Sequence, residues 1–289
     1  MTSPREPAPA GLPPVPELVA VAERIAREAG RLILDGRPQT VGVAATKSSA
    51  VDVVTAMDLA SEELLRRMLA ELRPDDAVLG EEGGHRAGTS GVTWVVDPID
   101  GTVNYLYGLP AYAVSVAAVV GEPTPATWTV LAACVHAPAT QETWTAGRGL
   151  GAHLDGRRLT LGATPPLAGC LLGTGFGYVA ERRRAQARVL AALLPQVRDV
   201  RRMGAAAIDL CQVATGRLDL YYERGLQPWD LAAGALVVAE AGGVVTGLRG
   251  APAGSGMTVA GTPERVAELV RILEEQAADA PDGAGRESG

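Results

Sequence analysis

A short apolar run in this sequence leads directly into two acids. Residues 94–104 read WVVDPIDGTVN, so the apolar run ends at Asp97 and Asp100. Such a run is typical of a buried strand, and Pro98 and Gly101 predict a tight turn after it. Burying carboxylates without a partner is unfavourable, and this segment contains no lysine, arginine or histidine. The fold must therefore bring a cation to the end of this strand.

The donor atoms of this segment suit a hard metal ion. Two carboxylates and a backbone carbonyl such as that of Ile99 offer only oxygen atoms, and oxygen ligands favour Mg²⁺ over zinc or copper. From the segment alone an alternative stays open, since an Asx-turn followed by a helix N-cap would explain Asp100 without any metal.

Three further segments place acids where they could join this pair. GEEGG puts Glu81 and Glu82 after a second predicted strand, DVVTAMD places Asp52 and Asp58 around a helix start, and PWD puts Asp230 in a first helical turn. Each has a plain explanation alone, because helix dipoles favour acids at helix starts and Glu82 could be a solvated charge. Together with the strand-end pair they indicate one metal basin.

Hydrophobic periodicity predicts two patterns of secondary structure that meet near residue 150. Before it, helices are expected at residues 18–35 and 58–72, buried strands at 77–79 and 93–96, and an antiparallel meander at 112–145. After it, helices near 180–194, 204–215, 229–241 and 263–277 alternate with strands near 169–173, 197–201, 217–222, 244–246 and 257–260. No Ser/Gly linker separates the halves, so we expect one unit over residues 16–277, with disordered tails at 1–15 and 278–289.

The composition excludes several classes of protein. A hydrophobic share of 47% and a charged share of 20% exclude wholesale disorder. We expect a cytoplasmic protein without a membrane partner, because no apolar run approaches the roughly 20 residues of a membrane span and no signal peptide is apparent. A net charge of −7 argues against nucleic acid as a partner. Cys134, Cys170 and Cys211 are widely spaced and are expected as buried thiols.

A single lysine stands out among the basic residues. Of the 26 lysines and arginines only Lys47 is a lysine, and the other 25 are arginines. Chance could have retained it, or position 47 could require a compact ammonium that a planar guanidinium cannot replace.

The motifs, taken in order, resemble the inositol monophosphatase family. They are Lys47-Ser48-Ser49 with DVVTAMD, then GEE, WVVDPIDGTVNY, RRMGAAAIDL, ATGRLDLYYE and PWDLAAGALVVAEAGG, covering roughly residues 16–275. The resemblance implies an α/β (α+β) fold, the layered αβαβα sandwich of the inositol monophosphatase and fructose-1,6-bisphosphatase type. It also implies a metal site between the two halves, and a homodimer.

The resemblance further implies which residues form the site. Glu81, Asp97 and the carbonyl of Ile99 would hold a first Mg²⁺, Asp97, Asp100 and Asp230 a second, and a weaker third ion would lie near Glu81. Asp58 and Thr102 would orient and deprotonate the attacking water, with Glu81 and Lys47 assisting. The substrate would meet Asp100, Asp230, Glu223, the N–H groups of Gly101 and Thr102, and the turn formed by Gly204, Ala205 and Ala206.

The implied activity is Mg²⁺-dependent hydrolysis of a small phosphate monoester, with inositol 1-phosphate the first expectation. Histidinol phosphate and fructose bisphosphate are rival substrates, and adenosine bisphosphate is the least favoured because no long insertion could build a nucleotide pocket. A rival of another class is a non-catalytic regulator that binds a protein or RNA. Two departures from the family pattern are Val103 and Ala205, and Ala205 removes a hydroxyl expected on the sugar side. The glycines at residues 173–177 favour a turn beside that pocket over a nucleotide loop.

Overall fold

The structure, a computed structural model, describes residues 12–38, 41–46 and 53–280. Its α-helices are α1 (Val15–Asp35), α2 (Ala56–Leu72), α3 (Thr102–Tyr107), α4 (Ala180–Leu193), α5 (Ala206–Ala214), α6 (Pro228–Glu240) and α7 (Pro263–Glu275). The helices and strands that the sequence predicts are present, with ends shifted by a few residues. A short antiparallel pair, β1 (Val43–Thr46) and β2 (Val53–Thr55), precedes α2.

The larger sheet has eight strands in the order β10-β9-β8-β7-β6-β5-β3-β4. They are β3 (Ala77–Gly80), β4 (Gly84–Arg86), β5 (Val92–Asp100), β6 (Ala113–Val120), β7 (Thr129–Ala137), β8 (Glu142–Gly147), β9 (Gly151–Leu154) and β10 (Arg157–Arg158). Strands β6 to β8 form the antiparallel meander predicted for residues 112–145, which β5, β9 and β10 extend, and only the pair of β3 with β5 is parallel.

The smaller sheet has five strands in the order β12-β11-β13-β15-β14. They are β11 (Leu171–Thr174), β12 (Asp199–Arg201), β13 (Leu220–Glu223), β14 (Val244–Thr246) and β15 (Thr258–Gly261). β11 is parallel to β12 and to β13, whereas β15 is antiparallel to both of its neighbours.

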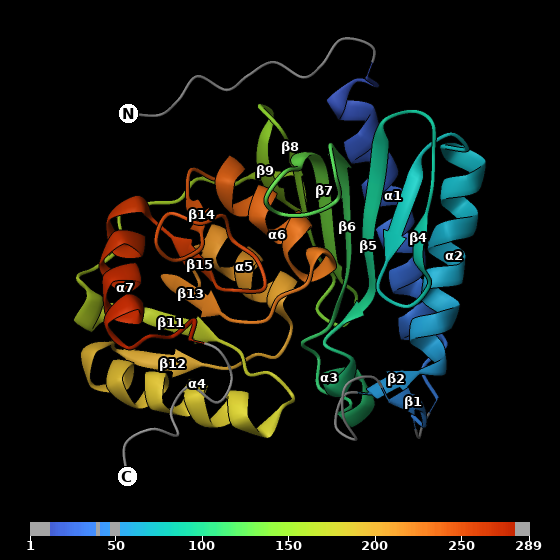
Figure 1. Cartoon of the computed structure of the whole chain (residues 1–289). Helices are drawn as coiled ribbons and strands as arrows, with labels where there is room; N and C mark the ends of the chain where they lie inside the picture. Colours follow the sequence, from blue (N-terminus) through green and yellow to red (C-terminus); the bar gives the residue numbers. More distant parts are fainter. Residues whose placement is uncertain (1–11, 39–40, 47–52, 281–289) are drawn as a thin grey trace.

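Helices and sheets alternate in five layers (Figure 1). α1 and α2 cover one face of the eight-stranded sheet, α5 and α6 lie between the two sheets, and α4 and α7 cover the outer face of the five-stranded sheet. Three clusters of buried side chains fill the spaces between these layers. The expected layered α/β sandwich is confirmed.

Strand β5 is apolar on both sides because helices cover both faces of its sheet. Trp94 and Val96 face the cluster beneath α1 and α2, and Val95 faces the cluster around α5 and α6. Side chains alternate between faces along a strand, so a strand buried on both sides reads as a continuous apolar run. This burial explains why the acids that follow Val96 begin inside the protein.

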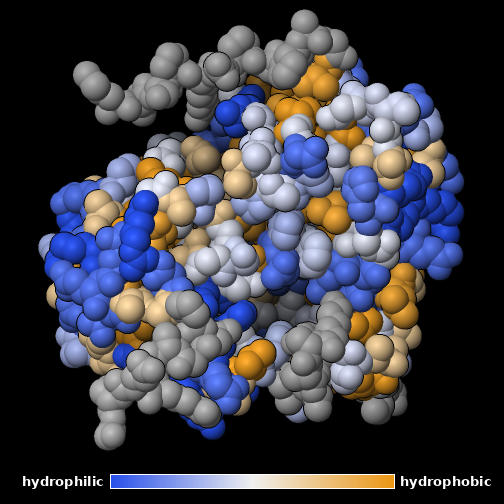
Figure 2. All heavy atoms as spheres, in the orientation of Figure 1, coloured by the Kyte–Doolittle hydropathy of each residue, from blue (hydrophilic) through white to orange (hydrophobic). Residues whose placement is uncertain are grey.

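The outer surface agrees with this layering. Figure 2 shows mostly hydrophilic residues over the flanks formed by α7 on one side and α2 on the other. Ala278 is buried in the cluster beneath α7, so the packed part of the chain reaches at least this residue. In the part of the chain that the structure describes, no helix combines the length and apolar character needed to cross a membrane. The three cysteines are buried free thiols, as expected.

Candidate active site

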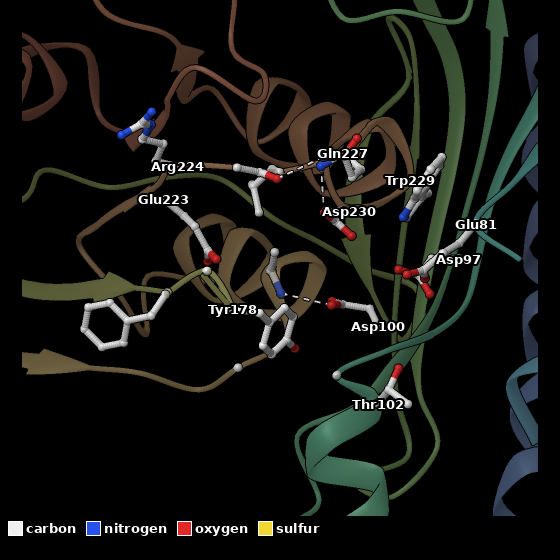
Figure 3. A pocket seen from close by; sticks show the side chains of 18 of the residues that line it. Glu81, Asp97, Asp100, Thr102, Tyr178, Glu223, Arg224, Gln227, Trp229 and Asp230 are labelled. Atoms are coloured by element: carbon white, nitrogen blue, oxygen red, sulfur yellow. Dashed lines mark hydrogen bonds between the residues drawn. The ribbon is translucent and has the colours of Figure 1, made fainter. Parts of the chain in front are cut away.

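Two acids of the site lie at the ends of parallel strands. β3 and β5 pair with Gly80 opposite Val96, so the next residues, Glu81 and Asp97, lie side by side as β3 ends. Figure 3 shows their two carboxylates next to each other. The parallel register is therefore the reason that residues from separate motifs meet here.

A bulge in β5 turns Asp100 towards the same place. Asp97 pairs with Ser115 of β6 and Asp100 with Ala113, so a step of three residues on β5 faces a step of two on β6. The extra residue interrupts the strict alternation of side chains between the two faces of the sheet. Pro98 lies inside the bulge, where a residue without an N–H group is tolerated.

Asp230 reaches the site from the first turn of α6. The hydroxyl of Ser115, which pairs with Asp97, donates a hydrogen bond to the carbonyl of Trp229 at 3.1 Å and so holds the start of α6 against β6. The Asp230 carboxylate also accepts a hydrogen bond of 2.7 Å from the N–H of Gln227. Carboxylate oxygens of Asp97, Asp100 and Asp230 lie within 4.8 Å of one another.

The three carboxylates have no compensating cation in the described part of the chain, where no Lys, Arg or His lies within ion-pair distance of any of them. Burial raises the pKa of Asp97 well above its usual range, and the adjacent Glu81 raises it further. Burial also raises the pKa of Asp100 to about 7 and that of Asp230 well above its ordinary value. Closely spaced oxygen donors with this electrostatic strain fit a hard divalent cation, which would favour their ionised forms.

Asp100 does not form the Asx-turn that the segment alone left open. Its two carboxylate oxygens accept hydrogen bonds from the N–H groups of Ala206 and Ala207, at 3.2 and 2.7 Å, in the first turn of α5. The Asx-type contact belongs to Asp97, whose Oδ1 accepts from the N–H of Ile99 at 3.0 Å. Asp100 therefore ties the second half of the chain to the strand that carries the acids.

Ala205 differs from its expected place on the sugar side. It is the N-cap of α5, is buried, and does not line the pocket, whereas Gly204 and Ala206 do. An alanine cannot cap a helix with its side chain, so the first amides of α5 are satisfied by Asp100 instead.

Asp58 and Thr102 form a hydrogen-bonded pair beside the acids. Thr55 caps α2 and forms a capping box with Asp58, so the helix begins at Ala56, two residues before the expected start. Thr55 also donates from its hydroxyl to Asp58 Oδ2 at 2.5 Å. The other oxygen, Oδ1, lies 3.0 Å from the hydroxyl of Thr102, which is also 3.1 Å from the carbonyl oxygen of Ile99. A threonine has one hydroxyl proton, and the carboxylate is the stronger acceptor.

A pocket of about 430 Å³ opens beside these residues. Glu81, Asp97, Ile99, Asp100, Gly101, Thr102, Gly204, Ala206, Glu223 and Asp230 all line it. Figure 3 shows Glu223 across the pocket from Asp97 and Glu81. Burial raises the pKa of Glu223, while a hydrogen bond of 2.6 Å from the Tyr221 hydroxyl lowers it. Carboxylates thus occupy both ends of the cavity.

Sequence reasoning missed several residues that line the pocket. These are Tyr178, Arg182, Arg202, Arg224, Gln227 and Trp229. Some signals were available, since Arg224 follows Glu223 and Trp229 precedes Asp230 directly in the sequence. Gly175 and Gly177 do lie in the pocket wall, but Gly173 and Thr174 belong to β11, so the expected turn over residues 173–177 is not formed. Lys47 lies outside the described residues.

Known proteins resemble this chain over most of its length. The model of the inositol monophosphatase family matches residues 15–278. The chain is 46% identical over 276 residues to the inositol-1-monophosphatase of Mycobacterium bovis, covering 89% of this chain and 93% of that protein. It is 41% identical over 237 residues to a Xylella fastidiosa protein named Nus factor SuhB, covering 81% and 83%.

The fold is also that of solved structures. The extragenic suppressor protein suhB from Bartonella henselae superposes with a TM-score of 0.82 at 33% identity, covering 90% of this chain and 99% of that one. Because the family match spans every strand end and helix start that supplies an acid to the site, the chain belongs to the inositol monophosphatase family.

Proposed function

We propose that the protein is a Mg²⁺-dependent phosphatase of small phosphate monoesters, with inositol 1-phosphate as its first candidate substrate. The observation that carries this proposal is the buried cluster of Asp97, Asp100 and Asp230, whose oxygens lie within 4.8 Å of one another and lack a cationic partner among the described residues. The neighbouring Asp58 and Thr102 pair supplies a route for a proton.

The proposed ligands are Glu81, Asp97, the carbonyl of Ile99, Asp100 and Asp230, for two to three ions. Mg²⁺, when bound, supplies a Lewis acid that lowers the pKa of water and neutralises charge on the phosphate. Asp100 retains free lone pairs for this role because each carboxylate oxygen accepts only one hydrogen bond from α5.

Thr102 and Asp58 are proposed to remove the proton of the attacking water. With its own proton directed to Asp58 Oδ1, Thr102 Oγ1 can accept a hydrogen bond from water on the pocket side. The water proton would then pass through this hydroxyl to Asp58, which Thr55 holds in place through Oδ2. Asp58 is buried behind Thr102, so this relay keeps the base away from the negatively charged phosphate.

Substrate recognition is proposed for the opposite wall of the pocket. Glu223 would accept hydrogen bonds from polyol hydroxyls, and the backbone of Gly204 and Ala206 would border the ring. The N–H groups of Gly101 and Thr102 would receive phosphate oxygens. The family resemblance also suggests a homodimer. Size-exclusion chromatography with light scattering would test this oligomeric state.

The test is a panel of phosphate monoesters assayed with and without Mg²⁺. Inositol 1-phosphate is expected to give the highest kcat/KM, and histidinol phosphate or fructose 1,6-bisphosphate in first place would reassign the substrate within the same chemistry. Full activity after exhaustive chelation would refute the metal mechanism. Asp97→Asn is expected to abolish turnover while leaving the fold intact.

A second candidate function is a non-catalytic binding role, which the relatives named Nus factor favour. The two functions are separable, because Asp97→Asn removes a proposed ligand without changing the outer surface. A cellular phenotype of the gene deletion that Asp97→Asn restores fully would support the non-catalytic role. A phenotype that only the active protein restores would support phosphatase activity alone.

A further inference from the structure

A buried glutamate on α2 holds the loop that carries Glu81. Glu62 is only 3% exposed. Its Oε2 accepts a hydrogen bond from the N–H of Glu82 and its Oε1 one from the N–H of Gly83, both at 2.7 Å. These amides directly follow Glu81, so Glu62 fixes the backbone from which the Glu81 side chain extends.

The loop is shaped around this carboxylate. A Cβ atom added at Gly80 would lie 2.4 Å from Glu62 Oε1, and one added at Gly83 would lie 2.6 Å from the same atom. Real Cβ atoms essentially never approach another atom so closely. The two glycines on either side of the acidic pair therefore allow the chain to close on Glu62.

The charge of Glu62 is compensated by an arginine, unlike the charges of Asp97, Asp100 and Asp230 in the described part of the chain. Arg66, one turn further along α2, donates from Nε to Glu62 Oε1 at 2.7 Å. Arg66 also donates from Nη2 to the carbonyl of Gly84 at 2.5 Å, on the far side of the same loop. Glu62 thus accepts three hydrogen bonds and pairs with an arginine, and we call this arrangement, which holds the loop after β3, the clamp. It is distinct from the proposed metal site formed by Asp97, Asp100 and Asp230.

We propose that Glu62 is a positioning residue that sets the divalent-cation affinity of the site by holding Glu81 beside Asp97. This inference rests on the proposed function, in which Glu81 is a ligand. Figure 3 shows Glu81 reaching Asp97 from the segment that follows Gly80, the last residue of β3. Groups that orient metal ligands typically change affinity 10- to 100-fold when they are replaced.

The test compares Glu62→Gln with Glu63→Gln in the full-length protein. Both remove one negative charge from adjacent positions of α2, but Glu63 is exposed and Glu62 is buried. The amide nitrogen of a glutamine cannot accept a backbone N–H, so Glu62→Gln loses one of the two loop bonds. Mn²⁺ binding, followed by calorimetry or by electron paramagnetic resonance, is expected to weaken at least about tenfold in Glu62→Gln and less than twofold in Glu63→Gln.

A second variant guards against a general loss of folding. Gly83→Ala perturbs the same clamp from the loop side and leaves Glu62 and Arg66 unchanged, and it is expected to weaken Mn²⁺ binding in the same way. Thermal unfolding in the presence of a chelator reports the stability of each variant separately from its metal affinity.

The outcomes are distinct. Wild-type Mn²⁺ affinity in both Glu62→Gln and Gly83→Ala, with or without a lower Tm, would show that the clamp is only structural and would overturn the inference. Absence of Mn²⁺ binding by the wild-type protein would instead refute the proposed function itself. Weakened binding in Glu62→Gln and Gly83→Ala, but not in Glu63→Gln, supports the positioning role.

Discussion

Gly175→Ala should displace Glu223 and so weaken recognition of substrate hydroxyls. β11 and β13 are parallel with Thr174 opposite Tyr222, which brings the next residues, Gly175 and Glu223, together. A Cβ atom at position 175 would lie 1.8 Å from Glu223 Oε2 and 2.1 Å from its Cδ. The carboxylate would have to leave the position in which the Tyr221 hydroxyl holds it at 2.6 Å.

The size of the effect follows from the bonds that Glu223 would lose. A hydrogen bond between this carboxylate and a substrate hydroxyl involves a charged group, and such bonds contribute about 1.5–3 kcal/mol. Since about 1.4 kcal/mol corresponds to a tenfold change in rate, kcat/KM for inositol 1-phosphate should fall about 10- to 150-fold. The Mg²⁺ concentration needed for half-maximal activity should change little, because Glu223 lies across the pocket from the metal ligands.

The assay compares inositol 1-phosphate with p-nitrophenyl phosphate, which has no hydroxyl groups for Glu223 to bind. We expect the loss for the first substrate only. Gly162→Ala is the control, since an added Cβ there has no neighbour within 4 Å among the described residues. Tyr221→Phe should act in the same direction but more weakly, whereas Tyr222→Phe, on the opposite face of β13, should not. Equal losses for both substrates, or none, would refute the role given to Glu223.

Three further predictions concern stability and the lysine. Asp76, which is buried, accepts hydrogen bonds from Trp94, Arg73 and Ser90, so Asp76→Ala should lower the free energy of unfolding by about 3–5 kcal/mol in a urea titration, against little change for the exposed Asp75→Ala. Burial, with Glu223 nearby, raises the pKa of Asp209, whose oxygens lack a hydrogen-bond partner in the described structure. Above the unfolded pKa of 3.8, folding is therefore coupled to proton uptake by Asp209, and the free energy of unfolding falls as pH rises. Asp209→Asn in Mg²⁺ should therefore raise Tm more at pH 8 than at pH 6. A larger gain in Tm at pH 6 than at pH 8 would contradict the predicted direction of this pH dependence. Lys47→Arg should lower kcat/KM clearly at unchanged Tm, with the exposed Arg67→Lys as control. A change in kcat/KM within about twofold, which is a barrier change under roughly 0.5 kcal/mol, would show that this lysine has no special role.

Local sequence patterns predicted the helices and strands well, because the formation of these elements depends mainly on residues that are close together in the chain. The apolar run before Asp97 identified a strand buried on both faces, and the acids at Asp58 and Asp230 marked helix starts. The expected strand at residues 93–96 nevertheless extends to Asp100 in the structure. This extension depends on pairing with Ala113 through a bulge, and no local pattern encodes the partner strand.

The burial of individual residues was harder to predict from the sequence. Glu62 precedes another glutamate on a helix and reads as a surface charge, yet the loop after β3 closes over it. Ala205 was expected beside the substrate, but as the N-cap of α5 it faces the core. In both cases the deciding contacts come from segments distant in the sequence.

The chemistry available to the site is visible in the amino-acid sequence: oxygen donors without a basic residue nearby, placed at strand ends and in first helical turns. Which of these acids meet depends on the folded structure. Glu81 and Asp230 are 149 residues apart, the difference of their numbers, and they share one pocket because β3 runs parallel to β5 and Ser115 holds the start of α6. Side-chain chemistry is a property of each residue, whereas proximity depends on the pairing and packing of elements that are remote along the chain.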